Sequence, residues 1–380
     1  MTQSNIAIIG SGIAGLSICH WLLQSNTSAK IHLFYDLDPM MASNAPTLLF
    51  HPFPGRSVNP PAYLSQAVQH SVHILEEWQR ILPRSIRKVP ILRPLTPTNG
   101  KRLEQSFHKW WNPPSKDLES TASFEYVASQ EIQDKEPLYQ IPYDALEIRP
   151  SYSIDGADVI SGMLQYFSEK GVVVQQQHVE NIQQYNEEYR LNDDPQSFHK
   201  VVLALGRQSH DWFPHLDISV QGGALLQSPL PTIHHNLSMD GLHLGQHANG
   251  NWVIGSTRWD EEPSIQSQIG LLIDKLHKVL PNIKLRHECH SSKDLWMGMR
   301  CIYGPDRLPL MGALPHHRNI FVLTALGSKG WLWGPYAAKL LCNLLQDRAL
   351  DQRELTLFDL MRANAEDGWY SPNIHFESHT

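Results

Sequence analysis

The sequence predicts an α/β fold that begins with a Rossmann-like dinucleotide-binding unit, and three observations support this prediction. The first is a strand, a glycine loop and a helix in direct succession at the N-terminus. The second is a set of short apolar runs, typical of buried parallel strands, at residues 171–174, 201–206 and 319–324. The third is another glycine loop before a helix, about 300 residues after the first. With 380 residues, the chain is long enough for two domains.

The N-terminal loop has the spacing of a diphosphate-binding turn. The apolar run 6–9 is followed by Gly10, Ser11, Gly12, Ile13, Ala14 and Gly15, and then by an apolar-periodic helix. Gly10 permits a tight turn, Gly12 lets the backbone approach a pyrophosphate, and Gly15 lets the helix pack against the strand. The helix N-terminus offers free N–H groups and a positive dipole to the phosphates. These six residues are therefore predicted to bind a dinucleotide.

A second strand, residues 31–34, should end in an acid that binds the adenosine ribose. The sequence has Tyr35 at that position, and Asp36 and Asp38 follow. We interpret Asp36 as the ribose ligand, with an ordinary turn residue as the alternative.

The late glycine loop predicts the other end of an extended cofactor. The strand 319–324 runs into Gly327, Ser328, Lys329 and Gly330, and a helix is expected from about Trp331 to Leu345. The positive end of that helix would stabilise negative charge on the N1/C2 carbonyl edge of a reduced flavin. The alternative is an ordinary turn of an α/β protein. Two such turns favour FAD over NAD.

Charge and cysteine usage limit the remaining classes. The net charge of −7 argues against a generally basic nucleic-acid binder. Residues 80–109 nevertheless carry eight basic side chains and one acid, which is either a solvated rim or a surface for phosphates. We expect neither a membrane span nor a secretion signal, because no long apolar segment or basic leader is visible. The four cysteines are scattered along the chain, as is typical of reduced thiols in a cytoplasmic protein. The histidines lack the spacing of a metal-binding pair, so we predict no metal site.

Seven segments, in this order along the chain, resemble one enzyme family: IAIIGSGIAGLS, APTLLFHPFPGR, VVLALGRQS, MDGLHLG, WVIGSTR, MGMRCIYGPDRLPLMG and FVLTALGSKGWLWGPYAAKLL. They are similar to the FAD-dependent oxidoreductases of the D-amino-acid-oxidase family, which includes glycine and sarcosine oxidases. Within that family they look most like the FAD oxidase domain of MnmC, a tRNA wobble-uridine modification protein. Two features depart from the family pattern: the displaced acid after the second strand, and one extra residue between Arg300 and Pro309.

The resemblance implies a chemistry and a set of site residues. Family members transfer a hydride from a C–H bond beside an amine to the flavin, and the resulting imine is hydrolysed. Arg300 corresponds to the arginine that holds the substrate carboxylate, Arg258 is a second candidate, and His51 could contact the flavin ring. For these three, a structural salt bridge or a satisfied loop histidine is the alternative. The further FAD contacts implied are Ser43, Val174, Ala204, Gly206 and Trp331.

Two substrates fit this chemistry, and a third possibility is no catalysis. The likeness of the segments favours the first substrate, a tRNA uridine, whereas the net acidity favours the second, a small amine. An MnmC-like enzyme would remove the carboxymethyl group from carboxymethylaminomethyl uridine in tRNA, with the basic stretch from Arg80 to Lys109 on the phosphates. The other enzyme would oxidise free glycine, sarcosine or a D-amino acid. A flavin-binding protein without catalysis is the third alternative.

The resemblance also predicts the domain organisation. Residues 1–55, 145–215 and 300–360 are expected to form a discontinuous FAD-binding domain of the glutathione-reductase type. Residues 56–144 and 216–299 are expected to form a substrate domain, an antiparallel β-sheet with helices. Residues 361–380 are expected to form a C-terminal tail.

Overall fold

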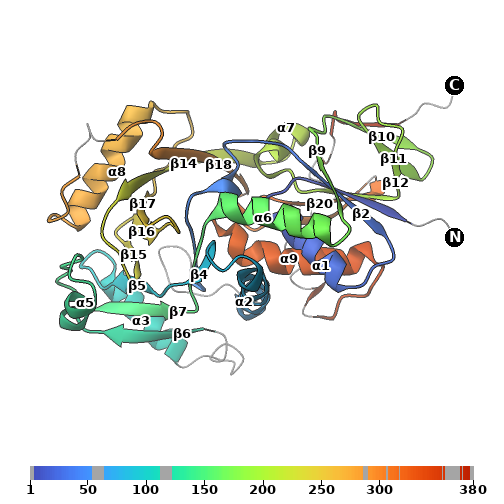
Figure 1. Cartoon of the computed structure of the whole chain (residues 1–380). Helices are drawn as coiled ribbons and strands as arrows, with labels where there is room; N and C mark the ends of the chain where they lie inside the picture. The colour runs from blue at the N-terminus through green and yellow to red at the C-terminus, as the bar shows by residue number, and fades with distance from the viewer. Residues whose placement is uncertain are drawn as a thin grey trace. The chain divides into compact units, whose positions relative to one another are not determined.

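A computed structural model describes residues 4–53, 64–111, 122–285, 290–304, 307–315, 317–352, 354–355, 369 and 371–376, with the side chains of 64, 106–111 and 376 excepted. The chain divides into two compact units. Unit 1 comprises Met1–Ser43, Ile160–Gln221 and Met299–Thr380, and unit 2 comprises Asn44–Val159 and Gly222–Gly298. Figure 1 shows the helices and strands of both units.

Unit 1 is built on a six-stranded sheet with the order β19-β20-β13-β1-β2-β9. All its neighbouring strands pair in parallel except β19, which runs antiparallel to β20 at one edge. The strands are β1 (Asn5–Ile9), β2 (Lys30–Tyr35), β9 (Val173–Gln176), β13 (Lys200–Leu203), β19 (Leu310–Leu314) and β20 (His317–Thr324). Parallel strands end at the same edge of a sheet, so the loops after β1, β2, β13 and β20 share one edge.

Two different layers cover the faces of this sheet. Helices α1 (Ile13–Gln24) and α9 (Gly330–Leu345) pack side by side on one face, as Figure 1 shows. On the other face, alternate residues of β1, β13 and β20 form a core with a second sheet. That four-stranded sheet has the order β12-β11-β10-β21, from β10 (Ile182–Tyr185), β11 (Glu188–Leu191), β12 (Ser197–Phe198) and β21 (Ile374–Phe376).

The segment predicted as a C-terminal tail contains structure that the sequence did not indicate. Strand β21 pairs in parallel with β10, and Ile374 lies opposite Ile182. Trp369 is buried, and its ring meets that of Phe213 edge-on with centroids 5.1 Å apart. Within the segment predicted as a tail, Trp369 and residues 374–376 therefore belong to the core and the second sheet of unit 1.

Unit 2 is built on an eight-stranded sheet with the order β18-β14-β17-β16-β15-β5-β7-β6. Its strands are β5 (Ile91–Pro94), β6 (Ser123–Val127), β7 (Ala145–Arg149), β14 (Ile218–Pro229), β15 (Asn236–Met239), β16 (Leu242–Gln246), β17 (Asn251–Gly255) and β18 (Leu295–Tyr303). Helix α8 (Ile265–Val279) covers one face and buries Ile269, Leu272, Ile273 and Leu276 in the core of this unit. A small sheet of β3 (Leu48–Phe50), β8 (Tyr152–Ile154) and β4 (Ile86–Lys88) completes the strands of unit 2.

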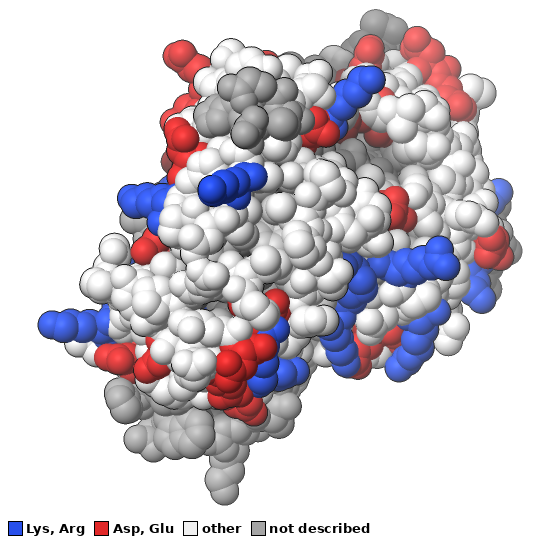
Figure 2. Space-filling view, turned by 60° about the vertical axis from the view of Figure 1, so that its left-hand side comes forward, with Lys and Arg blue, Asp and Glu red and all other residues white. Residues whose placement is uncertain are grey.

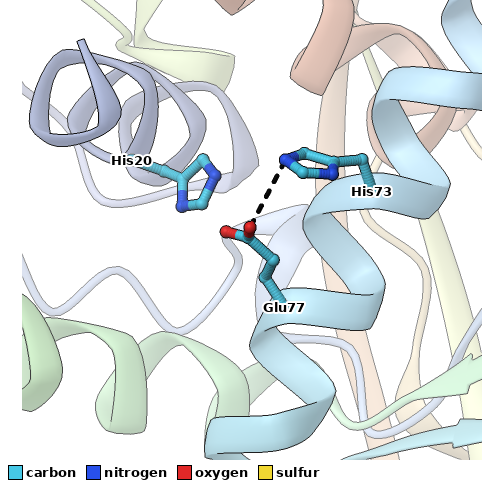
Figure 3. A group of neighbouring side chains, drawn as sticks. All are labelled: His20, His73 and Glu77. Atoms are coloured by element: carbon cyan, nitrogen blue, oxygen red, sulfur yellow. Dashed lines mark ion pairs between the residues drawn. The ribbon is translucent and has the colours of Figure 1, made fainter.

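Three further helices belong to unit 2: α2 (Leu64–Ile81), α3 (Gly100–Trp111) and α5 (Ser129–Lys135). The amphipathic spacing of residues 62–82 predicts α2, which buries Val68, Leu75 and Trp78 on one face. On its polar face, His73 Nε2 lies 3.4 Å from Glu77 Oε1, one turn further along the helix (Figure 3).

His235, predicted to lie in a loop without a metal, is a buried link between two carboxylates of unit 2. Its Nδ1 lies 2.9 Å from Glu136 Oε1, and its Nε2 lies 3.0 Å from Glu147 Oε2. The His234 N–H also donates to Glu136 Oε1, at 2.6 Å. Both ring nitrogens are thus bound by side chains, so this histidine has a structural role.

The boundaries of the two units differ from those of the predicted domains. Residues 44–55 and 145–159 lie in unit 2, because β3 pairs with β8, β8 pairs with β4, and β7 pairs with β5 and β6. Residues 216–221 lie in unit 1. Among the described residues, no helix is both long and apolar enough to cross a membrane.

Candidate cofactor-binding site

The turn after β1 is shaped by glycines that no larger residue could replace. Gly10 has a φ of 112°, and a Cβ placed on it would lie 2.3 Å from the carbonyl oxygen of Ala204. A Cβ on Gly15 would lie 1.8 Å from the carbonyl oxygen of Gly10. Both distances are far inside van der Waals contact, and the obstacle is backbone that cannot rotate away. The turn, β13 and α1 therefore pack closely only because these residues lack side chains.

The N-terminus of α1 fits a bound phosphate. Ile13 donates its N–H to Ser43 Oγ at 3.1 Å, and no acidic residue lies in the first turn of the helix. The Ser11 hydroxyl is buried and makes no hydrogen bond within the described part of the chain. A buried hydroxyl is usually hydrogen-bonded, so an oxygen-rich ligand at this helix end would satisfy it. Gly12 and Ala14 complete the turn, and a Cβ on Gly12 would lie 3.3 Å from Ser43 Oγ.

Two acids follow β2, and they differ in their surroundings. Asp36 is exposed; its Oδ2 lies 2.7 Å from His178 Nδ1, and its Oδ1 accepts the Leu37 N–H at 2.7 Å. Asp38 is mostly buried and accepts two hydrogen bonds from the Arg207 guanidinium, at 2.7 and 3.1 Å. Asp36 therefore keeps the more accessible carboxylate at the end of β2. Its role with ribose remains a proposal.

Three predicted contacts lie on a parallel strand of the six-stranded sheet or directly after one. Val174 is half-buried on β9, opposite Leu33 of β2. The Ala204 N–H donates to the Ile9 carbonyl at 2.8 Å, which fixes the end of β13 against β1. Gly206 has a φ of 56° and begins a short 3₁₀ helix, Gly206–Gln208. Val174 thus lies within the sheet, and Ala204 and Gly206 follow β13 at the common edge.

The late turn lies directly beside the first one. It contains a 3₁₀ turn, Gly327–Lys329, and Gly327 has a φ of 57°. Helix α9 starts at Gly330, where an added Cβ would lie 3.1 Å from Cγ2 of Ile13 at the start of α1. The two helix N-termini are therefore neighbours within unit 1. Ser328 is exposed at this turn, and Trp331 is buried in the first turn of α9.

Lys329 gives the late turn a positive charge in a partly buried place. Burial lowers the pKa of its ammonium group below the usual value, and the charge of Arg307 lowers this pKa further. Both positive groups and the positive end of α9 would favour a ligand that becomes negative. The sequence identified Lys329 but gave no signal for Arg307.

Arg300 lies on β18, which bridges to the loop after β2 and to the residue before the late turn. The preceding residue, Met299, forms an isolated bridge with Met41, and Ile302 forms one with Leu326. Cys301 points inward, where its Sγ accepts the Ala325 N–H at 3.3 Å. Because side chains alternate along a strand, Arg300 points to the opposite side. Its Nη2 donates to Gln221 Oε1 at 3.0 Å, and it is only partly buried.

The two other predicted catalytic residues belong to unit 2. Arg258 is exposed just after β17, where the neighbouring Thr257 Oγ1 accepts the Ala224 N–H at 3.1 Å. His51 follows β3 and is partly buried. Burial and the nearby charges of Arg93 and His243 lower the pKa of His51 to about 3. His51 is therefore neutral near pH 7, and sequence reasoning missed the two residues that make it so.

One acidic group outside this site has metal-ligand spacing. One ligand atom each of Asp155, Asp158 and His247 lies within 4.8 Å of the others. The buried Asp155 carboxylate already accepts hydrogen bonds from Arg87, at 3.1 and 3.3 Å, and from the Ala248 N–H, at 2.9 Å. The positive charge beside Asp155 is thus an arginine of the chain itself, and we assign no metal to this group.

Comparisons with known proteins agree with this geometry. A search of curated protein sequences found no match. Glycine oxidase from Geobacillus kaustophilus is similar in structure, with a TM-score of 0.75, 17% identity, and coverage of 92% of this chain and 96% of that one. Iminodiacetate oxidase from Chelativorans sp. BNC1 has a TM-score of 0.73 and 16% identity, with 91% and 96% covered. For L-α-glycerophosphate oxidase from Mycoplasma pneumoniae with FAD bound, the TM-score is 0.70 and the identity 16%, with 91% and 95% covered.

At these identities the solved structures establish the fold, which is the predicted α/β fold of FAD-binding oxidoreductases. The family itself is shown by a sequence model described as FAD dependent oxidoreductase, DAO, which matches residues 5–344. The chain therefore belongs to the DAO family of FAD-dependent oxidoreductases, and FAD is its cofactor.

Proposed function

We propose that this enzyme oxidises the C–N bond of an amine that carries a carboxylate. A hydride leaves the carbon beside the nitrogen, and water then adds to the resulting C=N bond and splits it into an amine and a carbonyl compound. When bound, FAD accepts the two electrons of that hydride. The observation that carries the proposal is the position of Arg300, on a strand that bridges to Met41 in the loop after β2 and to Leu326 just before the late glycine turn.

Arg300 would bind the carboxylate and so fix the reacting carbon. A guanidinium offers parallel N–H groups that match the two oxygens of a carboxylate. The hydrogen bond from Nη2 to Gln221 Oε1, at 3.0 Å, holds the guanidinium in a set direction. Such orientation lowers the entropy cost of reaching the reactive geometry.

The late turn would stabilise the charge that the reaction creates. A reduced flavin held at this turn would carry negative charge at its N1/C2 edge. Lys329 and the N-terminal end of α9 supply positive charge in unit 1, and both lie beside the start of α1. Fixed charges of this kind need little reorganisation during the reaction.

Among the possible substrates, a small free amine is supported by the state of the basic stretch. Of its seven described basic side chains, Arg87 pairs with Asp155, Lys88 pairs with Glu76, and Arg93 is buried. On the face in Figure 2, several basic side chains gather toward the lower right with acidic ones beside some of them, and most of the remaining surface is uncharged. A tRNA-binding surface usually presents a basic patch.

MnmC-like demodification of tRNA is the second candidate. Its support is the likeness of the sequence segments, together with four exposed basic side chains of the same stretch: Arg80, Arg84, Lys101 and Arg102. Lys109, at the end of the predicted surface, has no described side chain.

The test is anaerobic mixing of the yellow holoenzyme with single substrates. Glycine, sarcosine and D-amino acids form one group, and tRNA bearing carboxymethylaminomethyl uridine forms the other. We expect a small carboxylate-bearing amine to bleach the flavin absorbance. Bleaching by the tRNA alone would establish the second candidate instead. If no amine of either group bleaches a flavin that dithionite still reduces, the proposed function is wrong.

Arg300→Ala tests the carboxylate anchor. We expect the variant to keep its flavin and to lose about 2 to 5 kcal/mol in kcat/KM for the carboxylate-bearing amine, the scale for removing one side of a desolvated charge pair. Arg318→Ala, which removes an exposed arginine from β20, is the matched control and should react as the wild type does. Equal kinetics for Arg300→Ala and Arg318→Ala would remove Arg300 from the site.

A further inference from the structure

The large sheet of unit 2 has one apolar face, defined by a row of residues that crosses five strands. The pairing places these side chains next to one another: Leu92, Leu237, Leu244, Ile254 and Leu226. None is more than 2% exposed, and all belong to the core that includes α8. Side chains alternate between the two faces of a sheet along each strand, so the residues directly before and after this row point to the opposite face.

The next row faces away from α8 and is partly polar. Ser238 pairs with His243, His243 pairs with Gly255, and Gly255 pairs with Leu225. Arg93 follows Leu92, whose partner Leu237 precedes Ser238, so Arg93 continues the same row on β5. The face opposite the core thus carries an arginine, a serine and a histidine side by side.

Arg93 is the charged centre of this row. Its side chain is only 6% exposed, and its Nη1 donates to the Phe53 carbonyl oxygen at 3.0 Å. Burial lowers the pKa of Arg93 to about 10, which still leaves the guanidinium charged near neutral pH. A charge held this deep is costly unless other groups interact with it.

Two imidazoles accompany Arg93, and the charges that act on them are all positive. Burial, Arg93 and His243 together lower the pKa of His51 to about 3. Desolvation, Arg93 and Lys275 lower the pKa of His243 to about 4, although solvent still reaches this side chain. Both rings are neutral near pH 7, so each can offer an N–H. The buried Nδ1 of His51 makes no hydrogen bond within the described residues.

We propose that Arg93, His51 and His243 form an anion-binding site for a compact oxyanion, a carboxylate or a phosphate. The arginine supplies the charge, and the neutral imidazoles supply donors without adding charges that repel it. The site is independent of the proposed function, because all three residues lie in unit 2 and Arg300 lies in unit 1.

Calorimetric titration of the holoenzyme with acetate, and separately with inorganic phosphate, tests the site without any turnover. We expect saturable binding of at least one probe, and a loss of roughly 30-fold or more in affinity in Arg93→Gln. Lys278→Gln removes an exposed positive charge from α8 of the same unit and should bind as the wild type does. Tighter binding of acetate would show that the site prefers a carboxylate, and tighter binding of inorganic phosphate would show that it prefers a phosphate group.

Because Arg93 is buried, the Arg93→Gln variant could fail to fold, and a second variant keeps the test decisive in that case. His243→Gln changes a solvent-accessible ring, and we expect several-fold weaker binding of the same probe with an unchanged melting temperature. The proposal is wrong if the wild type binds neither probe, or if folded Arg93→Gln and His243→Gln both bind like the wild type. Failure of the proposed function would look different, because amines would then leave the flavin oxidised while anion binding persisted.

Discussion

At the scale of single residues, the cofactor site depends on where side chains are absent. The glycines at 10 and 15 are needed because backbone carbonyl oxygens occupy the space of their missing Cβ atoms. Spacing alone identified these positions in the sequence, since a tight turn between a strand and a helix has few solutions. The accessible acid at 36 was also predictable from its place after β2.

Gly15→Ala should prevent FAD binding. Its Cβ would lie 1.8 Å from the Gly10 carbonyl oxygen, so the turn must open and the N-terminus of α1 must move. The flavin absorbance per mole of purified protein should fall close to zero. Gly250→Ala is the control: Gly250 has a φ of 92° and open space around it, so that change should cost about 1 kcal/mol of stability and leave the flavin in place. Full flavin content in Gly15→Ala would contradict the geometry of this turn.

Lys329 should produce an alkaline limit to activity. Burial and Arg307 lower its pKa, so its ammonium group loses its proton at a lower pH than a free lysine does. Its charge is present below that pKa and disappears as the pH rises through it. We therefore expect flavin reduction to slow at high pH in the wild type. Lys329→Arg should move this limit to higher pH, because arginine stays charged. An identical pH profile in the two proteins would exclude Lys329 from charge stabilisation.

Other single residues could not be predicted, because their roles depend on neighbours distant in sequence. Arg93 looked like one member of a solvated basic stretch, yet β5 buries it beside β15. A strand of apolar residues with a single arginine was the available signal. Arg307 gave no signal, because only the fold brings its charge near Lys329.

At the scale of elements, strongly periodic segments were predictable and short edge strands were not. Helix α2 was recognised from its apolar spacing, and α9 from the glycine turn before it. Strand β21 has three residues and gains its stability from pairing with β10, which is almost 200 residues away in sequence. Local propensity carries no information about such a partner.

Trp369→Ala tests the attachment of the C-terminal segment to unit 1. The buried indole packs edge-on against Phe213, and its removal would leave a cavity in this core. We expect the free energy of unfolding to fall by about 3 to 5 kcal/mol, measured by denaturant titration. Leu355→Ala, at a side chain that is 40% exposed, should change it by less than about 0.5 kcal/mol. Equal stability of the two variants would mean that residue 369 adds nothing to the fold.

At the scale of the whole molecule, the chain builds each unit from separated segments. Unit 1 takes three pieces of sequence and unit 2 takes two. The sequence predicted this interleaving through its resemblance to a family, but it misplaced the segments around residues 50 and 150. Those segments form β3, β7 and β8, whose partners are strands of unit 2. Pairing partners, rather than local pattern, decided these boundaries.

The central claim is that one FAD molecule extends from the Gly10–Gly15 turn to the Gly327–Gly330 turn, with Arg300 beside its reactive end. A crystal structure of the holoenzyme measures this directly. We expect the diphosphate within hydrogen-bonding distance, about 3 Å, of the N–H groups at the start of α1, and the N1/C2 edge of the flavin at the start of α9. A flavin ring bound away from the late turn, with Arg300 out of its reach, would contradict the account.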